Sequence, residues 1–356
     1  MKHIVIIIDG TWVSAADADN PFSNAYNLNW LLDSRAEDGN EQIVLYTSGI
    51  GSDKAAAPFL SGATARGIDH QTREAYINIC SNFKRTDKNG LPDKIYLFGF
   101  SRGAVVARAL SAMISIFGIL RPSHMNHFPA LWKRFVNGEV LRAGKLENIL
   151  YRDVDVQMIG LFDCVFGVRD RTGRFHTLRF PNYNVPSKVR AAVHLLSLDD
   201  TRRAFSPMLW DGGQCEHVEQ IWMPGVHSDI GGTFRDNRLG KICLMTMLDR
   251  ISQYTELRFH PESVARFMRF EGSFTVNNEI AGPWRFSLRC PRAHHPSGPG
   301  QYLHPLVGEL EDNFEIKYKG RQQVYRLHPK FQSKRDELPT FASFKNEHKW
   351  ADYAGL

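Results

Sequence analysis

Five short apolar runs recur along the first two thirds of the chain, and each passes into polar or glycine-rich sequence at its carboxyl end. None of them alternates apolar with polar residues, as a strand with one face in water would. Continuous apolar runs of this length are typical of strands buried on both faces of a parallel sheet. The expected strands span 3–12, 42–52, 94–103, 156–165 and 220–232.

Helical patterns separate these runs. Apolar residues recur at helical spacing over 62–85, before the third run, and over 102–117, directly after it. Strands that alternate with helices favour right-handed βαβ crossovers. We therefore predict an α/β fold with a mostly parallel central sheet and helices on both of its faces.

The rest of the chain is less regular. Residues 121–150 contain Pro, Trp, Phe and His without a strand pattern, and we interpret them as a helical insertion over the sheet. Residues 253–330 contain Pro- and Gly-rich stretches that indicate loops. The expected organisation is a catalytic core over 1–250 and a covering or appended region over 251–356.

The appended region is basic. The chain has 44 Lys and Arg against 38 Asp and Glu, a formal net charge of +6, and residues 313–350 hold nine of the former and four of the latter. Such a segment can contact an anionic membrane or an acidic partner, although a solvated charged face is the simpler interpretation. No nucleic-acid partner is expected.

Cysteine usage and hydropathy bear on the cellular setting. The five cysteines are scattered, without a C-x-x-C pair, which favours a reducing compartment and argues against a disulfide or zinc scaffold. The amino-terminal apolar run is too short for a signal peptide, and the longest other run, 112–120, is shorter than a membrane span. We expect synthesis in the cytoplasm, with export possible by a route that needs no cleaved signal.

The strongest chemical signal is Gly99-Phe100-Ser101-Arg102-Gly103, which matches G-x-S-x-G between an expected strand and an expected helix. In this motif the serine lies on a sharp turn that holds its hydroxyl above the sheet, and the glycines permit close backbone approach. Ser101 is therefore the candidate nucleophile, supported by Gly99 and Gly103. The alternative is a small residue in a tight connection.

A serine nucleophile needs a base, and the chain order Ser, Asp or Glu, His is expected for this motif. Asp163 ends the run 156–165 and is the candidate acid; its alternative role is a helix cap or a buried ion-pair partner. His227 follows the last run in a glycine-rich loop and is the candidate base. His194 is expected to be a hydrogen-bonded core residue on a helix. The weaker candidates are His294, His295, His304 and His328.

Further polar residues are expected at the same edge, because ligands of open α/β sheets bind at the carboxyl ends of the strands. The backbone N–H groups of Gly10, Thr11 and Arg102 are candidates for an oxyanion hole. Asp9 either braces this loop or is an ordinary turn residue. Asp229, two residues after His227, is a further supporting candidate.

Successive motifs of the chain resemble those of the DUF2235 family, which includes the Tle1-type phospholipase effectors of bacterial type VI secretion. They are IIIDGTW, YTSGIGS, LFGFSRGA, GLFDCV, LLSLDDTRRAFSPMLW and WMPGVHSDIGG, and they extend from about residue 3 to residue 250. The resemblance implies an α/β-hydrolase fold and hydrolysis of lipid esters, with phospholipid acyl chains as the substrate. It places the nucleophile on Ser101, the triad acid on Asp163 and the base on His227. It also makes an immunity protein or a secretion-apparatus protein a candidate partner.

Two other functions are alternatives to a serine esterase that needs no cofactor. A metal-dependent phosphoesterase would use Asp9, Asp163, His227 and Asp229 as ligands, because carboxylates and histidine at strand ends suit a divalent ion. A non-catalytic binding domain on a hydrolase scaffold is the second. Four aromatic residues either line an acyl groove or belong to the core: Phe117, Phe128, Trp132 and Phe135.

Overall fold

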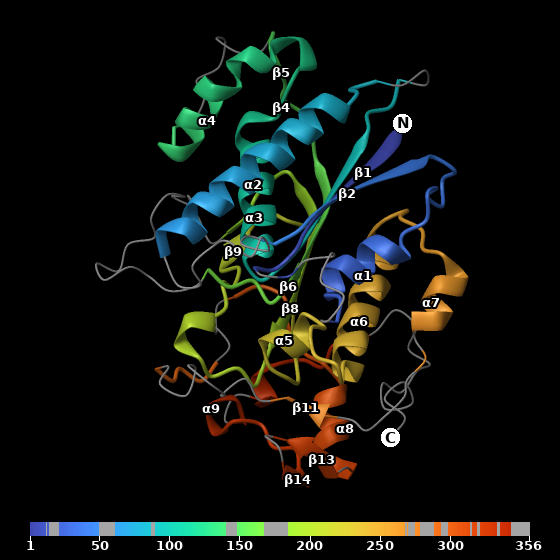
Figure 1. Cartoon of the computed structure of the whole chain (residues 1–356), viewed down its shortest axis with the longest axis vertical. Coiled ribbons are helices and arrows are strands. Elements are labelled where there is room, and N and C mark those ends of the chain that lie inside the picture. The colour runs from blue at the N-terminus through green and yellow to red at the C-terminus, as the bar shows by residue number, and fades with distance from the viewer. Residues whose placement is uncertain are drawn as a thin grey trace.

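The centre of the structure, a computed structural model, is a sheet of seven parallel strands in the order β12-β10-β8-β6-β3-β1-β2 (Figure 1). The strands are β1 (Lys2–Ile8), β2 (Glu41–Thr47), β3 (Lys94–Phe100), β6 (Val156–Phe162), β8 (Val189–Ser197), β10 (His217–Met223) and β12 (Gln301–Leu303). The predicted α/β class and parallel sheet are confirmed. The structure describes residues 1–11, 13, 21–49, 61–86, 90–139, 148–166, 184–267, 269, 275–277, 288–292, 298–313, 315–318, 321–332 and 335–342.

Five of these strands were expected, and two were not. The prediction of a helix around His194 is wrong, because this residue lies on β8. The apolar stretch in β8 is too short for periodicity to separate a buried strand from a buried helix. At three residues, β12 is too short to carry a pattern at all.

Alternate residues of the strands serve two separate cores. In β1, the side chains of Ile4, Ile6 and Ile8 pack into one apolar cluster, and those of Val5 and Ile7 pack into another. All five are almost completely buried. Successive side chains of a strand point to opposite faces, so a run with no polar member requires a covering layer on each side of the sheet.

Helices supply both layers (Figure 1). α2 (Ser61–Asn82) and α3 (Arg102–Phe117) cover one face, whereas α1 (Asn24–Leu31) and α6 (Arg238–Tyr254) cover the other. The two helices predicted from periodicity are α2 and α3, and α3 has the predicted bounds.

The strand order changes direction at β1. β1 lies between β2 and β3, so the connection after β1 runs one way and the connections from β3 onward run the other. Ligands of parallel sheets bind at the carboxyl ends of the strands where this reversal occurs. Asp9 and Gly10 follow β1, and Ser101 follows β3, so all three lie at this point.

The remaining elements are short. Residues 121–150 carry η1 (Pro122–His127) and α4 (Phe128–Val136), flanked by the antiparallel pair β4 (Ile119–Leu120) and β5 (Leu150–Tyr151); 140–147 lie outside the described residues. β7 (Asn184–Val185) pairs with β9 (Gly212–Gly213), η2 (Arg203–Phe205) lies between them in sequence, and α5 (His227–Ile230) follows β10.

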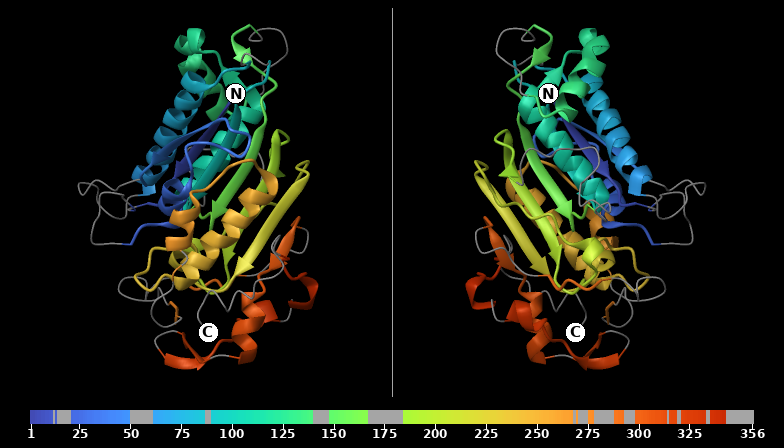
Figure 2. Two further views of the ribbon diagram at one scale, coloured as in Figure 1. Left: turned by 90° about the vertical axis from the view of Figure 1, so that its right-hand side faces the viewer. Right: turned by 90° about the vertical axis from the view of Figure 1, so that its left-hand side faces the viewer.

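Most of the C-terminal part lies beyond the carboxyl ends of the central strands (Figure 2). A small sheet joins β11 (Thr275–Val276), β13 (Glu315–Tyr318) and β14 (Arg321–Val324), and the helical elements are α7 (Pro261–Phe267), α8 (Leu306–Asn313), α9 (Pro329–Gln332) and η4 (Arg335–Glu337). Within this part β12 adds the last strand to the central sheet. The division of the chain at residue 250 therefore stays a prediction.

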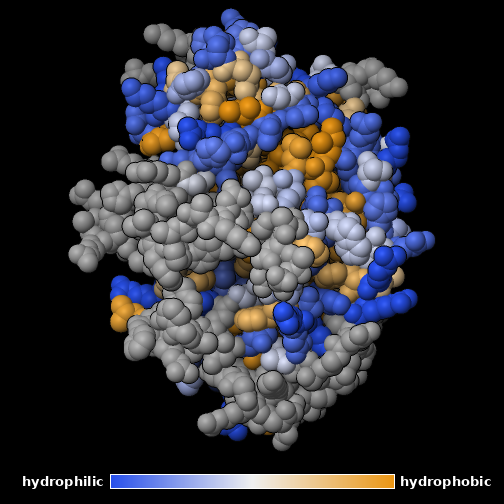
Figure 3. All heavy atoms as spheres, viewed as in Figure 1, coloured by the Kyte–Doolittle hydropathy of each residue, from blue (hydrophilic) through white to orange (hydrophobic). Residues whose placement is uncertain are grey.

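Among the coloured residues of the face seen in Figure 3, apolar side chains gather in the upper half, and β2 forms one edge of the central sheet. Val44 and Leu45 of this strand are only partly buried, unlike the residues of β1. Among the described residues, no helix has both the length and the apolarity needed to cross a membrane.

Gly160 of β6 is closely packed against side chains of the neighbouring strand β3 and of α6, and this packing leads to a stability prediction. A Cβ on Gly160 would lie 2.5 Å from Cδ1 of Phe98 and 2.9 Å from the sulfur of Met247. We expect Gly160→Ala to lower the free energy of unfolding by about 1–3 kcal/mol, because overpacking a dense core forces its neighbours to move.

The matched control is Gly308→Ala in α8, where the nearest atom to a new Cβ is a terminal guanidinium nitrogen at 3.4 Å. This change should be neutral or stabilising by about 0.5–1 kcal/mol, because alanine favours a helix over glycine. Urea unfolding of both variants measures the difference, and equal effects would contradict the packing argument.

Candidate functional site

Ser101 lies on a strained turn between β3 and α3. Its φ is 57° and its ψ is −120°, a conformation that residues with a side chain rarely adopt and that costs about 1–3 kcal/mol. Its backbone N–H donates to the carbonyl oxygen of Phe162 at 3.0 Å, which ties the turn to the end of β6. The side chain is 5% exposed.

The two glycines of the turn are required by contact with backbone. A Cβ on Gly103 would lie 2.3 Å from the carbonyl oxygen of Ile8, and one on Gly99 would lie 2.5 Å from the carbonyl oxygen of Gly103. Both distances are shorter than real Cβ contacts. Because Gly103 has no side chain, the first turn of α3 can lie directly against the end of β1. Because Gly99 has none, the end of β3 can lie directly against that same turn.

The structure brings the three candidate residues into one hydrogen-bonded chain. Nε2 of His227 lies 2.9 Å from Oγ of Ser101, and Nδ1 of His227 lies 2.6 Å from Oδ2 of Asp163. All three side chains are at least nine-tenths buried. A neutral imidazole in this position carries its proton on Nδ1 and turns an unprotonated Nε2 toward the serine hydroxyl.

Asp163 and His227 are both held by contacts with neighbouring elements. Asp163 comes directly after β6, with its N–H bonded to the carbonyl oxygen of Leu195 at 2.8 Å and a positive φ of 40°. His227 is the first residue of α5. Its ring stacks on Phe100 and meets Phe205 edge to face, both with centroids 4.9 Å apart, so its orientation is fixed from two sides.

Arg292 is the residue of this site that the sequence did not reveal. Its two terminal nitrogens donate to the two carboxylate oxygens of Asp163, one on each oxygen. It lies between two segments outside the described residues, in sequence that indicates only loops, and arginines are common in such sequence. No local motif distinguishes it.

Burial keeps the ring of His227 neutral against the pull of the neighbouring carboxylates. Burial alone would raise the pKa of Asp163, but the positive charge of Arg292 and the hydrogen bonds from His227 and Arg292 outweigh it and hold this pKa below its ordinary value. Burial lowers the pKa of His227, and the opposing effect of Asp163 does not fully offset it. At neutral pH the pair is therefore carboxylate and neutral imidazole.

Two further carboxylates, those of Asp199 and Asp200, hold the backbone around His227. Asp200 accepts a hydrogen bond from the N–H of His227 at 3.3 Å and a bidentate pair from Arg202. Asp199 accepts from the N–H of Gly225 at 2.7 Å and from the hydroxyl of Tyr325 at 3.0 Å. The motif LLSLDDTRRAFSPMLW thus contributes the two aspartates that position the histidine loop.

Asp229 also belongs to this loop, but its carboxylate bonds away from Ser101. It accepts from the N–H of Val226 at 2.9 Å and from the side-chain amide of Asn277 at 2.7 Å. Burial raises the pKa of Asp229 to about 7, against these hydrogen bonds. Its observed contacts are those of a residue that shapes the loop.

The loop after β1 lies beside the serine. A Cβ on Gly10 would be 2.6 Å from Cδ1 of Phe100 and 3.3 Å from Cβ of Ser101, so glycine lets this loop pack against the serine turn. Asp9 bonds to the N–H of Gly10, to the hydroxyl of Tyr46 and to the hydroxyl of Ser23. These contacts are those expected of a bracing residue.

The competing histidines lie elsewhere. His194 is a buried, hydrogen-bonded core residue, as expected, and its Nε2 accepts the N–H of Cys164 at 2.9 Å. Burial lowers the pKa of both His194 and His304 to about 3. His328 is partly buried, and its backbone carbonyl accepts the N–H of Phe331. His294 and His295 lie outside the described residues.

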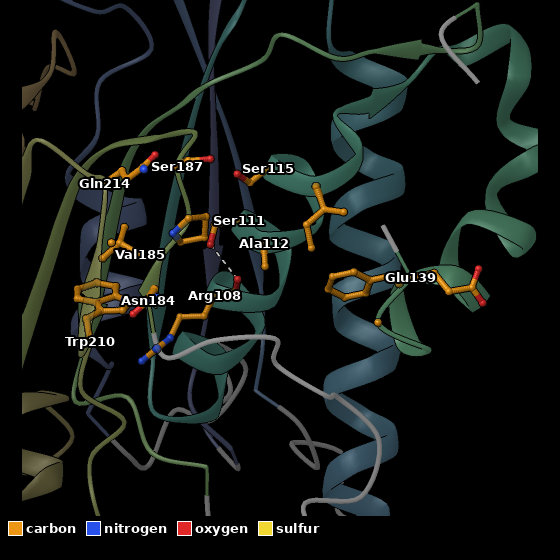
Figure 4. Close-up of a pocket in the computed structure, with 15 residues that line it drawn as sticks. Arg108, Ser111, Ala112, Ser115, Glu139, Asn184, Val185, Ser187, Trp210 and Gln214 are labelled. Atoms are coloured by element: carbon orange, nitrogen blue, oxygen red, sulfur yellow. Dashed lines mark hydrogen bonds between the residues drawn. The ribbon is translucent and has the colours of Figure 1, made fainter. Parts of the chain in front are cut away.

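A cavity of about 470 Å³ lies between α3, the end of α4 and the β7 and β9 segments (Figure 4). Arg108 and Trp210 lie on one side of it and Glu139 on the other. Arg108 follows Ser101 by seven positions on one helix, which is about 10 Å along its axis. Of the four aromatic candidates for an acyl groove, Phe135 lines this cavity, while Phe117 and Phe128 are buried in the core and Trp132 packs against it.

The four residues considered as metal ligands do not form one cluster. Among the described residues, no group of three or more His, Cys, Asp and Glu side chains is arranged to hold a metal ion. Asp9 and Asp229 are each engaged by their own hydrogen-bond partners, on loops on either side of the serine.

Residues 2–250 match the family described as the catalytic domain of Tle1-like phospholipase effectors of type VI secretion. An uncharacterized protein of Saccharomyces cerevisiae is 28% identical over 263 residues, which is 63% of this chain and 36% of that protein. The chain thus spans about a third of that relative.

Three solved structures are similar in part. An uncharacterized protein from Pseudomonas aeruginosa is 18% identical with a TM-score of 0.46, over 75% of this chain and 48% of its own. The Tle1 effector bound to the VgrG spike of the type VI secretion system is 22% identical with a TM-score of 0.40, over 66% and 51%. Esterase 2 of Thermogutta terrifontis, phosphoramylated by tabun, is 14% identical with a TM-score of 0.38, over 72% and 84%.

The ionisation of His227 can be tested directly. We expect this imidazole to be neutral at pH 7, protonated on Nδ1, and to take up its second proton only below the ordinary histidine pKa of about 6.5, because burial disfavours the charged ring. Nitrogen NMR shifts of labelled histidine, assigned with His227→Gln, measure the tautomer and the titration. A midpoint above 6.5 would contradict the described charge balance.

Proposed function

The chain belongs to the family of Tle1-like phospholipase effector catalytic domains, and we propose that it is a serine hydrolase that cleaves carboxylic esters of lipids through Ser101, His227 and Asp163. The observation that carries the proposal is the pair of hydrogen bonds at 2.9 and 2.6 Å that links these three side chains behind a strained serine turn. A serine whose hydroxyl meets a buried, oriented imidazole is the arrangement that nucleophilic catalysis requires.

In the proposed reaction, Oγ of Ser101 attacks the ester carbonyl carbon while its proton passes to Nε2 of His227. The imidazolium that forms is stabilised by Asp163, which keeps its negative charge throughout. His227 then gives this proton to the departing alcohol, and the C–O bond of the ester breaks to leave an acyl group on Ser101. A water molecule, deprotonated by the same imidazole, releases the acid and restores the hydroxyl.

Backbone N–H groups would stabilise the negative oxygen of the tetrahedral intermediate. Arg102 is the first residue of α3, so its N–H points out of the helix end beside Ser101. On the other side, the N–H of Gly10 bonds to Asp9 at 2.6 Å, which favours Thr11 over Gly10 as the second donor. The hydroxyl of Thr11 is buried without a partner among the described residues, which adds a further polar group near this position.

Phospholipid acyl esters are the proposed substrate class, and the support for them is membership of a phospholipase family. Contact with an anionic membrane through the basic segment 313–350, and with an immunity protein or a secretion-apparatus protein, belongs to the same proposal. Export by type VI secretion after synthesis in the cytoplasm would follow from it. The Tle1 effector of the similar solved structure is bound to the VgrG spike.

The alternatives account for fewer of the observed features. A metal-dependent phosphoesterase leaves the serine turn, its two glycines and the imidazole contact unexplained. A binding domain without activity leaves unexplained why a buried aspartate, a neutral histidine and a strained serine are joined in one hydrogen-bonded chain.

Replacing the nucleophile tests the proposal. We expect Ser101→Ala to lower the hydrolysis of p-nitrophenyl butyrate by about 10³-fold or more, because no covalent intermediate can form. The same change should abolish labelling of the protein by a fluorophosphonate, measured as an added mass on the intact chain. Ser123→Ala, at an exposed serine on η1, is the matched control and should behave as the wild type. Equal activity of Ser101→Ala and the wild type would refute the mechanism.

The class of bond cleaved can be read from the products. With phosphatidylglycerol or phosphatidylethanolamine vesicles, we expect free fatty acid and lysophospholipid, and activity that persists in EDTA. Mass spectrometry of the lipid extract separates these from diacylglycerol or phosphatidic acid, which would indicate phosphoester cleavage. Loss of activity in EDTA together with phosphoester products would favour the metal-dependent alternative.

A further inference from the structure

We infer that Arg292 is a positioning residue of the reaction, and that residues 288–292, outside the matched family region, complete the site by holding the carboxylate of Asp163 against His227. The inference rests on the proposed function, because it assigns a role in the same proton transfer. It concerns the part of the chain for which sequence indicates only loops.

Residues 288–290 are docked on the loop that follows β8. The N–H of Arg203 donates to the carbonyl oxygen of Leu288 at 2.9 Å, and the N–H of Cys290 donates to that of Thr201 at 2.7 Å. Arg202 and Arg289 form an antiparallel bridge between these two bonds. The short pairing directs the chain so that the side chain of Arg292, two residues later, enters the site.

The guanidinium of Arg292 is almost fully saturated by groups of the site. Besides the two oxygens of Asp163, it donates to the carbonyl oxygens of Ser197 at 3.1 Å and Phe205 at 2.7 Å. Its side chain is 1% exposed. A fork with two parallel N–H donors fixes the plane of a carboxylate, so Arg292 fixes the direction in which Asp163 presents its oxygen to His227.

Arg292 also sets the charge of the site. Among the described residues, the other donors to the buried carboxylate of Asp163 are neutral: the N–H of Ser197 at 3.0 Å and the ring of His227. An isolated buried anion attracts a proton, and the neighbouring imidazole would then rest as the imidazolium. With Arg292 present, Asp163 is already paired, and His227 remains an unprotonated base.

The other acidic groups near His227 have partners that a change at Arg292 leaves in place. Asp200 is paired with Arg202 beside the backbone N–H of His227, and Asp199 and Asp229 accept hydrogen bonds from uncharged groups. Removing Arg292 therefore makes the site more negative by one charge, because Asp163 loses its positive partner. By Coulomb's law this charge stabilises the imidazolium and raises the pH at which the base becomes active.

The test compares Arg292→Ala, Arg292→Lys and Arg289→Ala with the wild type, in ester hydrolysis and in the rate of fluorophosphonate labelling between pH 5 and 9. Arg289 is an exposed neighbour on the same segment and serves as the matched control. For Arg292→Ala we expect at least a tenfold loss of kcat at pH 6, a smaller loss at pH 8, and an acid limb moved upward by about one pH unit. Added guanidinium at millimolar concentration should restore part of kcat, whereas equal NaCl should not.

Arg292→Lys keeps a positive charge but not the fork, so it should retain the acid limb of the wild type while kcat falls. This variant keeps the test valid if Arg292→Ala does not fold, as judged by its melting transition. If the variants fold, keep the pH profile and rate of the wild type and do not respond to guanidinium, the role of Arg292 is refuted and the proposed function is unaffected. A wild type that is not labelled at Ser101 would instead overturn the proposed function, and the role of Arg292 with it.

Discussion

The hydrogen-bond ladder of the parallel sheet continues one residue beyond three of its strands. Asp9 bonds to the end of β2, Ser101 to the end of β6 and Asp163 to Leu195, two residues before the end of β8. Because neighbouring parallel strands end at the same edge, this continuation fixes the backbone of the three residues relative to one another before any side chain is placed.

Charge is compensated within the site in matched pairs. Asp163 faces Arg292 and Asp200 faces Arg202, and both pairs are almost completely buried. Burying a charge is costly unless it is paired and hydrogen-bonded. The result is that two of the acidic side chains around His227 are buried together with an arginine of opposite charge.

Most of the central strands and the three residues Ser101, Asp163 and His227 could be predicted from the sequence, whereas β8 and Arg292 could not, for physical reasons. Long apolar runs gave the central strands, and the G-x-S-x-G turn gave the position of Ser101, because both patterns are local. Asp163 and His227 could be chosen because residues at strand ends converge in any parallel sheet. β8 was misassigned since periodicity is ambiguous in a short buried run. Arg292 could not be found, because its contact with Asp163 spans 129 positions and depends on a pairing between two irregular segments.

Ser101 and Asp163 share one backbone property. They are the two non-glycine residues with positive φ in the described part of the chain. Each conformation costs about 1–3 kcal/mol, against a total stability of about 5–15 kcal/mol for a typical domain. Glycine at position 101 would relieve its strain, whereas glycine at position 163 would leave the buried Arg292 without its carboxylate. The backbone strain at Asp163 is thus offset by an ion pair, and the strain at Ser101 has no such compensation in its own side chain, whose hydroxyl bonds to the ring of His227.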